Sequence, residues 1–139
     1  MSFFFRYKSC KLQNKTVVHR PLIPFSLSWH GKNMDTFGIL DSGSDTTIIP
    51  LEIADFLNLE LKEENKVFGL DRNFIKVKEA KVNFTIGNDR ENYTFPIVVH
   101  VPIENIPMNV VIGRQDIFDN FEVTFSQIQK KIRFKKIAR

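Results

Sequence analysis

Apolar and polar residues alternate along much of the chain, which is the pattern of half-buried β-strands. In 25–29 aromatic and aliphatic residues alternate with serines, a turn-like segment follows at 30–33, and 34–40 forms a second apolar stretch. The same arrangement recurs around turn-like segments at 87–90 and 126–129. Alternation interrupted by turn residues predicts three antiparallel hairpins.

Helical periodicity is confined to short segments. Pro50 can begin a helix, whose apolar face would hold Ile53, Phe56 and Leu57. The segment 115–120 is long enough for one more turn or two. The sequence therefore predicts an all-β domain with one or two short helices.

Length and composition favour one folded domain. The chain has 139 residues, of which 42% are hydrophobic, including 14 Phe, and this supports a core and excludes a disordered chain. We expect residues 1–14 to form a flexible, basic N-terminal segment and 15–139 to form the domain. Phe residues precede the first positive charge, unlike a secretory signal, and no apolar run is long enough to span a membrane. We expect a cytoplasmic protein.

Cysteine and histidine are too sparse for the commonest structural metal sites. Cys10 is the single cysteine, which excludes an intrachain disulfide, and His19, His30 and His100 are far apart in the sequence. We therefore expect no metal.

The charge is concentrated at the two ends of the chain. Residues 1–20 hold five basic residues and no acid, residues 128–139 hold six and no acid, and 21–127 carry nine basic against 16 acidic residues, a net charge of −7. A basic tail of alternating residues is typical of a solvated edge strand. Aromatic and basic residues do not interleave as on a base-stacking surface, so nucleic-acid and membrane partners are disfavoured.

The most informative segment is 37–50, in which two apolar runs flank a polar turn. A strand would carry Asp41 into a tight loop, where Gly43 leaves room for a second backbone. The hydroxyls available to hold a carboxylate there are those of Ser42, Ser44, Thr46 and Thr47. Asp-Ser-Gly alone is ordinarily turn chemistry, but the longer pattern of apolar pair, acid, hydroxyl, glycine and threonine favours a fixed acid.

At Ile39-Leu40-Asp41-Ser42-Gly43-Ser44 the chain resembles the retropepsin-like aspartic peptidases. A second anchor is Val110-Val111-Ile112-Gly113-Arg114, which is similar to the family's later element, an apolar run ending in Gly and often Arg. That element packs behind the active-site loop and precedes a short helix, at the position of 115–118 here. The resemblance spans about residues 20–134 and implies a single-lobe, closed β-barrel.

This resemblance is to the cellular or prokaryotic branch rather than to viral enzymes. A hairpin follows the helix position in this chain, whereas viral enzymes end there in a short dimerising strand. The family needs no cofactor, and its substrates are peptides or proteins bound in extended form.

The resemblance makes Asp41 the catalytic residue. Attack of water on an amide requires two adjacent carboxylates that share one proton. The chain has one such loop, so the chemistry requires a symmetric homodimer in which each subunit contributes one Asp41. The expected loop supports are Ser42, Gly43, Ser44 and Thr46, with Ile112 and Gly113 from the later motif.

Two further features follow from the resemblance. Asp45 and Arg114 would form a partly buried ion pair near the dimer interface, the alternative being two solvated surface charges. The expected flap lies in 66–76, with Phe68, Gly69, Leu70 and Asp71 around its tip. Related flaps usually carry more glycines than this one.

The sequence thus predicts a homodimeric aspartic endopeptidase with substrate pockets at Ile39, Phe68, Leu70 and Ile112. The first alternative is a peptide-binding or adaptor module of the same fold without catalysis, favoured by the charged flap tip. The second is a nucleic-acid or membrane-surface adaptor that uses the basic ends.

Overall fold

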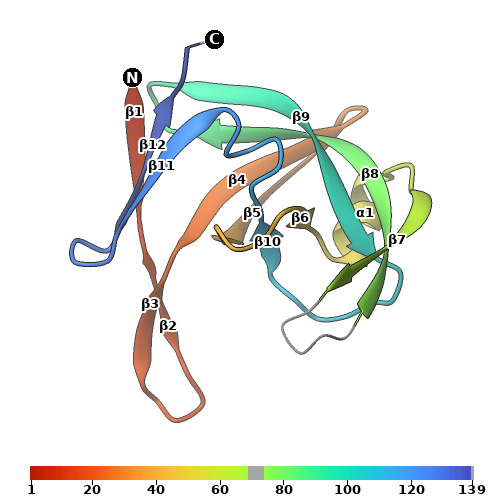
Figure 1. The fold of residues 1–139 in the computed structure, drawn as a ribbon, viewed down its shortest axis with the longest axis horizontal. Helices are drawn as coiled ribbons and strands as arrows, with labels where there is room; N and C mark the ends of the chain where they lie inside the picture. The colour runs from red at the N-terminus through yellow and green to blue at the C-terminus, as the bar shows by residue number, and fades with distance from the viewer. Residues whose placement is uncertain (69–73, 139) are drawn as a thin grey trace.

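The computed structural model describes residues 1–68 and 74–138. Its elements, in chain order, are β1 (Ser2–Arg6), β2 (Lys8–Lys11), β3 (Val17–Arg20), β4 (Leu22–Trp29), β5 (Lys32–Leu40), β6 (Thr47–Ile48), α1 (Leu51–Leu57), β7 (Lys62–Phe68), β8 (Phe74–Gly87), β9 (Asn92–Pro102), β10 (Val110–Ile112), β11 (Phe121–Ser126) and β12 (Lys131–Lys136). The predicted all-β class is confirmed, and Figure 1 shows how these elements divide into a barrel, a terminal sheet and a projecting hairpin.

The three predicted hairpins are confirmed as β4–β5, β8–β9 and β11–β12. Within the described residues, six strands close into a barrel in the order β4, β5, β10, β6, β9, β8 and back to β4. The closing pairs join β4 to β8, from Ser26 opposite Thr85 to Ser28 opposite Asn83. The alternating apolar residues of these strands face inward, so Leu27, Val82 and Phe84 are completely buried.

The short β10 strand is inserted between β5 and β6. It runs parallel to β5, with Ile112 opposite Leu40, and antiparallel to β6, with Val111 opposite Ile48. This insertion brings the end of the later sequence motif against the end of the strand that precedes Asp41.

Helix α1 begins after Pro50, as predicted, and ends at Leu57, before Asn58, which adopts a left-handed conformation. Ile53 and Leu57 face the core. Phe56 was expected on the same face, but it is 51% exposed because Ala54 occupies the buried position beside Leu57.

The second short helix expected at 115–120 is absent from the described residues, where the chain forms consecutive turns instead. Asp116 explains the difference, because its φ of 69° is left-handed and interrupts right-handed helical geometry. The Asp116 carboxylate accepts the N–H of Val98 at 2.9 Å, which fixes the turn against β9.

The N-terminus departs from the expected flexible segment 1–14. Strand β1 pairs with β12 over its whole length, and Phe3 is 2% exposed. The rings of Phe3 and Phe134 stack with their centroids 5.3 Å apart, and Phe121 meets Phe3 edge-on at 5.9 Å. Aromatic burial therefore holds the first strand in the core.

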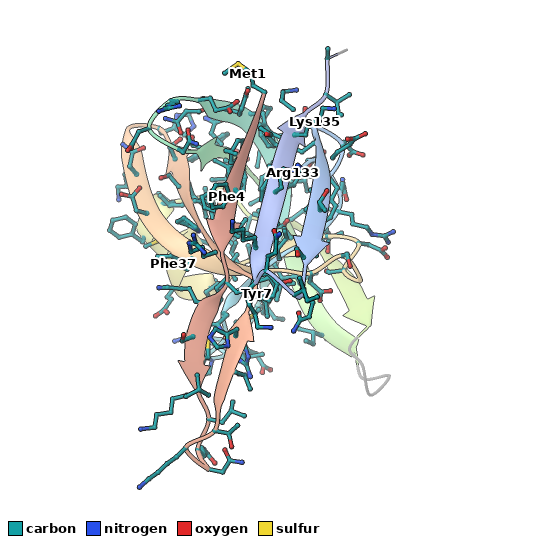
Figure 2. All side chains as sticks on the ribbon, turned by 90° about the vertical axis from the view of Figure 1, so that its left-hand side faces the viewer. Met1, Phe4, Tyr7, Phe37, Arg133 and Lys135 are labelled. Carbon is teal, nitrogen blue, oxygen red and sulfur yellow. The ribbon has the colours of Figure 1, made fainter. Side chains whose placement is uncertain are left out.

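The three-stranded terminal sheet has the order β1–β12–β11. The lysines of β12 predicted an edge strand, but β12 lies at the centre of the sheet. Ile132 and Phe134 face the core, whereas Arg133 and Lys135 are exposed. Figure 2 shows Phe4, Arg133 and Lys135 on the outer face of this sheet.

Across the described residues, the structure contains no helix that is long and apolar enough to cross a membrane.

Candidate active site

Asp41 follows directly after β5, at the point where two other segments bind the main chain. The Leu40 N–H donates to the carbonyl of Pro21 at 2.9 Å, and the Asp41 N–H donates to the carbonyl of Ile112 at 2.9 Å. The position of Asp41 is therefore set by β10 on one side and by the start of β4 on the other.

The turn after β5 fixes the carboxylate of Asp41. Its Oδ1 accepts the N–H of Gly43 at 2.9 Å, and its carbonyl accepts the N–H of Ser44 at 3.1 Å. Asp41, Ser42 and Gly43 are exposed in the single chain. A carboxylate held by a main-chain donor and facing solvent is available to a second molecule.

Two hydroxyls near this turn bind main-chain groups and stabilise the loop. Ser44 Oγ donates to the carbonyl of Thr46 at 2.8 Å, and Thr47 Oγ1 accepts the N–H of Gly113 at 3.1 Å. Thr47 is 1% exposed, so its hydroxyl needs such a partner. Thr46 itself is half-buried and lies beside Gly113.

The later motif packs behind the loop because Gly113 has no side chain. A Cβ on Gly113 would lie 2.1 Å from the carbonyl oxygen of Thr46. Beyond it, the N–H groups of Arg114 and Gln115 donate to the carbonyls of Ser44 and Asp45, each at 2.9 Å. Three successive residues of one segment thus bind the loop that follows Asp41.

The structure places the side chains of Asp45 and Arg114 in an ion pair, with Arg114 Nη2 donating to Asp45 Oδ1. Both side chains are solvent-accessible in the single chain, Asp45 at 83% and Arg114 at 54%. The pair was expected to be partly buried, and within one chain it is exposed.

The candidate flap occupies the expected place between α1 and β9. Strands β7 and β8 pair from Lys62 opposite Glu79 to Phe68 opposite Phe74. Gly69, Leu70 and Asp71, which were expected around its tip, lie outside the described residues.

A cavity of about 300 Å³ lies between the start of β8 and the segment after β9. It is lined by Ile75, Lys76, Pro102, Ile103, Glu104 and Ile106. The pocket expected at Ile112 is wrong, because that side chain is completely buried. Sequence reasoning missed the cavity since its lining comes from two segments that carry no motif.

Two structural features beyond the sequence motifs support the site. Thr47 supplies the hydroxyl behind Gly113, and Pro21 supplies the carbonyl beside Leu40. A threonine after Asp-Ser-Gly was a visible signal for the first, whereas nothing in the sequence indicated the second. Over the residues that the structure describes, His, Cys, Asp and Glu form no cluster of three or more that could hold a metal ion.

No family model and no curated protein sequence matches the chain. Among solved structures, a retropepsin-like aspartic protease from Rickettsia conorii is similar, with a TM-score of 0.60, 13% identity, and coverage of 99% of this chain and 94% of that one. EIAV protease complexed with the inhibitor HBY-793 gives a TM-score of 0.44 and 18% identity, covering 72% of this chain and 86% of that one.

The first of these likenesses extends over nearly the whole chain, including the terminal sheet. At this identity it concerns the course of the backbone. Together with the closed barrel and the inserted β10 strand, it shows that the chain has the single-lobe fold of the retropepsin-like aspartic proteases.

Proposed function

We propose that the chain is a homodimeric aspartic endopeptidase in which two copies of Asp41, one from each subunit, activate a water molecule. The observation that carries the proposal is the placement of the Asp41 carboxylate. It is held by the Gly43 N–H and exposed at the end of a strand that β10 locks in place.

The chemistry requires two such carboxylates. An ionised Asp41 takes a proton from water while the water oxygen attacks the substrate carbonyl carbon, and a protonated Asp41 on the other subunit donates to the carbonyl oxygen. Collapse of the tetrahedral intermediate breaks the C–N bond, and a proton passes to the leaving nitrogen. Two adjacent acids share one proton because two negative charges at short range repel each other.

Three features of the structure suit this role. The three bonds from Gly113, Arg114 and Gln115 hold the loop without using the carboxylate, so its free oxygen can bind water. The β7–β8 hairpin supplies the stems of a flap. The cavity lined by Ile75 and Ile106 could take an apolar substrate side chain.

Substitution of Asp41 tests the proposal. The wild type is mixed with an unbiased peptide library across pH 3 to 8, with and without a statine inhibitor, and cleavage is read by mass spectrometry. Asp41→Asn should reduce cleavage at least about a thousandfold, while the matched variant Asp35→Asn, which changes an exposed acid on the preceding strand β5, should cleave normally. Full activity in Asp41→Asn would remove this residue from the mechanism.

The alternative is a peptide-binding module of the same fold that does not cleave, and the charged sequence Leu70-Asp71-Arg72 favours it. Binding of peptides or of the statine inhibitor by the wild type, with no cleavage at any pH, would favour this alternative. Cleavage that the inhibitor blocks would exclude it.

A further inference from the structure

A hairpin arm, residues 8–20, projects from the body of the molecule. It consists of β2 and β3, which pair with each other from Lys8 opposite Arg20 to Lys11 opposite Val17. Among the described residues these two strands form a separate sheet. Both views show the arm extending away from the barrel and from the terminal sheet (Figures 1 and 2).

The arm leaves the body beside the candidate active site. Its second strand leads into Pro21, whose carbonyl accepts the N–H of Leu40, the residue before Asp41. At the other strand, Lys8 Nζ lies 3.6 Å from the ring centroid of Phe37, which is also on β5 and is 45% exposed. A two-fold axis between two Asp41 loops would therefore run close to the base of the arm.

The proposed dimer needs more contact area than the Asp41 turns offer. Stable protein interfaces bury about 1,200–2,000 Å² in total, and the exposed turn Asp41–Gly43 contributes three residues per subunit. The terminal strands are already paired within one chain, β1 with β12 along its whole length. Another surface near the axis must supply the remaining contacts.

The arm exposes apolar and basic side chains that another molecule could cover. A two-stranded hairpin alone is marginally stable in water, and this one exposes 55% of Val17 at its outer end. Its four basic residues are accompanied by no acid, whereas residues 21–127 carry a net charge of −7. Residues 21–127 contain the six barrel strands, so the arm is electrostatically complementary to the barrel of another copy of the same chain.

We propose that the arm is a dimerisation element, and that in the dimer each arm lies against the acidic barrel of the partner subunit. This rests on the proposed function, which brings two Asp41 loops together. It assigns to residues 8–20 the contacts that hold the two subunits in register. Because the symmetry makes each contact occur twice, the arms contribute doubly to the dimer.

Removal of the arm is the direct test. Residues 8–20 are replaced by two glycines that join Tyr7 to Pro21, which is possible because Lys8 and Arg20 are paired neighbours. Sedimentation over a concentration series should show the dimer dissociation constant raised at least about a hundredfold. The thermal transition measured on dilute monomer should be unchanged, since the arm forms a separate sheet.

Charge reversal provides a second test that leaves the fold intact. Lys11→Glu/Lys15→Glu changes two exposed arm residues, and Arg133→Glu/Lys135→Glu makes the same change in net charge on the terminal sheet. The arm pair should weaken the dimer at least about tenfold, and the terminal pair should leave it within about twofold. Added salt should weaken the wild-type dimer and reduce the difference.

The outcomes separate this inference from the proposed function. A wild-type dimer that persists unchanged without the arm, or after charge reversal in it, overturns the inference and leaves the Asp41 pair in place. Equal weakening by both charge pairs also overturns it, because net charge alone would then be responsible. A wild type that cleaves as a monomer contradicts the proposed function itself.

Discussion

Gly113 is the residue at which two distant parts of the chain approach most closely at the candidate site. A Cβ there would lie 2.1 Å from the carbonyl oxygen of Thr46 and 2.8 Å from its nitrogen, both of which are main-chain atoms that cannot rotate away. The glycine is therefore required by packing, which is a physical reason for its place in the motif.

Gly113→Ala should destabilise the fold by about 1–3 kcal/mol and lower the proposed cleavage, because the loop after Asp41 has to shift. Urea unfolding measures the first effect and a peptide assay the second. Gly31→Asn is the control, since no atom lies within 4 Å of the Cβ position there and Asn tolerates a φ of 84°. Equal stability of Gly113→Ala and wild type would contradict the packing argument.

The side chain of Arg114 is exposed, whereas its main-chain N–H binds the loop after Asp41. Its N–H and that of Gln115 bind the loop whatever side chains are present. Arg114→Ala should therefore change the unfolding free energy of the single chain by at most about 1 kcal/mol, as expected for a pair with both partners exposed. Denaturation at a concentration where the protein is monomeric measures this. A loss of several kcal/mol would show that the ion pair itself holds the loop.

Tyr93 gives a pH-dependent signal at the residue scale. Its hydroxyl donates to Glu91 Oε2 at 2.5 Å, and this hydrogen bond, with burial and the negative charge of Glu91, raises the pKa of Tyr93 above its usual 10.0. In a Tyr7→Phe background, absorbance titration should show Tyr93 ionising at a lower pH after Glu91→Gln. An unchanged titration would mean that the hydrogen bond does not form in solution.

Strand β1 shows how an element can be essential without a strong sequence signal. Phe3 and Phe4 are neighbours on opposite faces of the sheet, Phe3 2% and Phe4 51% exposed. Phe3→Ala should cost about 3–5 kcal/mol of stability, because it leaves a cavity among Phe121 and Phe134. Phe4→Ala should stay within about 0.5 kcal/mol. Urea unfolding of the two variants compares them directly, and similar losses would contradict the burial pattern.

Alternation of apolar and polar residues predicted the three hairpins, because their pattern lies within one short stretch of sequence. The hairpins around 30–33, 87–90 and 126–129 combine alternation with turn residues, so local physics was sufficient for them. The pairing of β1 with β12 was missed, because a run of three phenylalanines has no alternation and its partner lies at the other end of the chain. For the same reason β12 was expected at an edge.

The sequence predicted only those parts of the candidate site that lie within its two motifs. Asp41, Gly43 and Gly113 stand in recognisable patterns, and the structure brings their segments together. The Pro21 carbonyl, the cavity at Ile75 and the arm depend on tertiary placement of residues that no short pattern marks. The second short helix expected at 115–120 does not form, because the left-handed backbone of Asp116 interrupts helical geometry there.

At the scale of the whole molecule, the proposed enzyme should lose specific activity on dilution. One Asp41 per chain means that a lone subunit lacks half of the proposed catalytic pair. Specific activity plotted against concentration should therefore fall with the same midpoint as the dimer measured by sedimentation. Activity independent of concentration far below that midpoint would contradict a two-fold site.

Mixed dimers give a second whole-molecule prediction. When equal amounts of wild type and Asp41→Asn exchange subunits freely, random pairing leaves about half of the wild-type chains with an inactive partner. Activity per wild-type chain should fall by about half, whereas an equal mixture with the active Asp35→Asn control should keep the activity per total chain unchanged. Full retention in the first mixture would mean that each subunit works alone.

The pairing of β1 with β12 determines when the chain can finish folding. Strand β1 is synthesised well before β12, so their contacts have the largest sequence separation among the described strand pairs and form slowly. Until β12 has been synthesised and has left the ribosome, Phe3 lacks Phe134 as its stacking partner. A nascent chain that stops before β12 therefore leaves the apolar face of β1 without its partner strand.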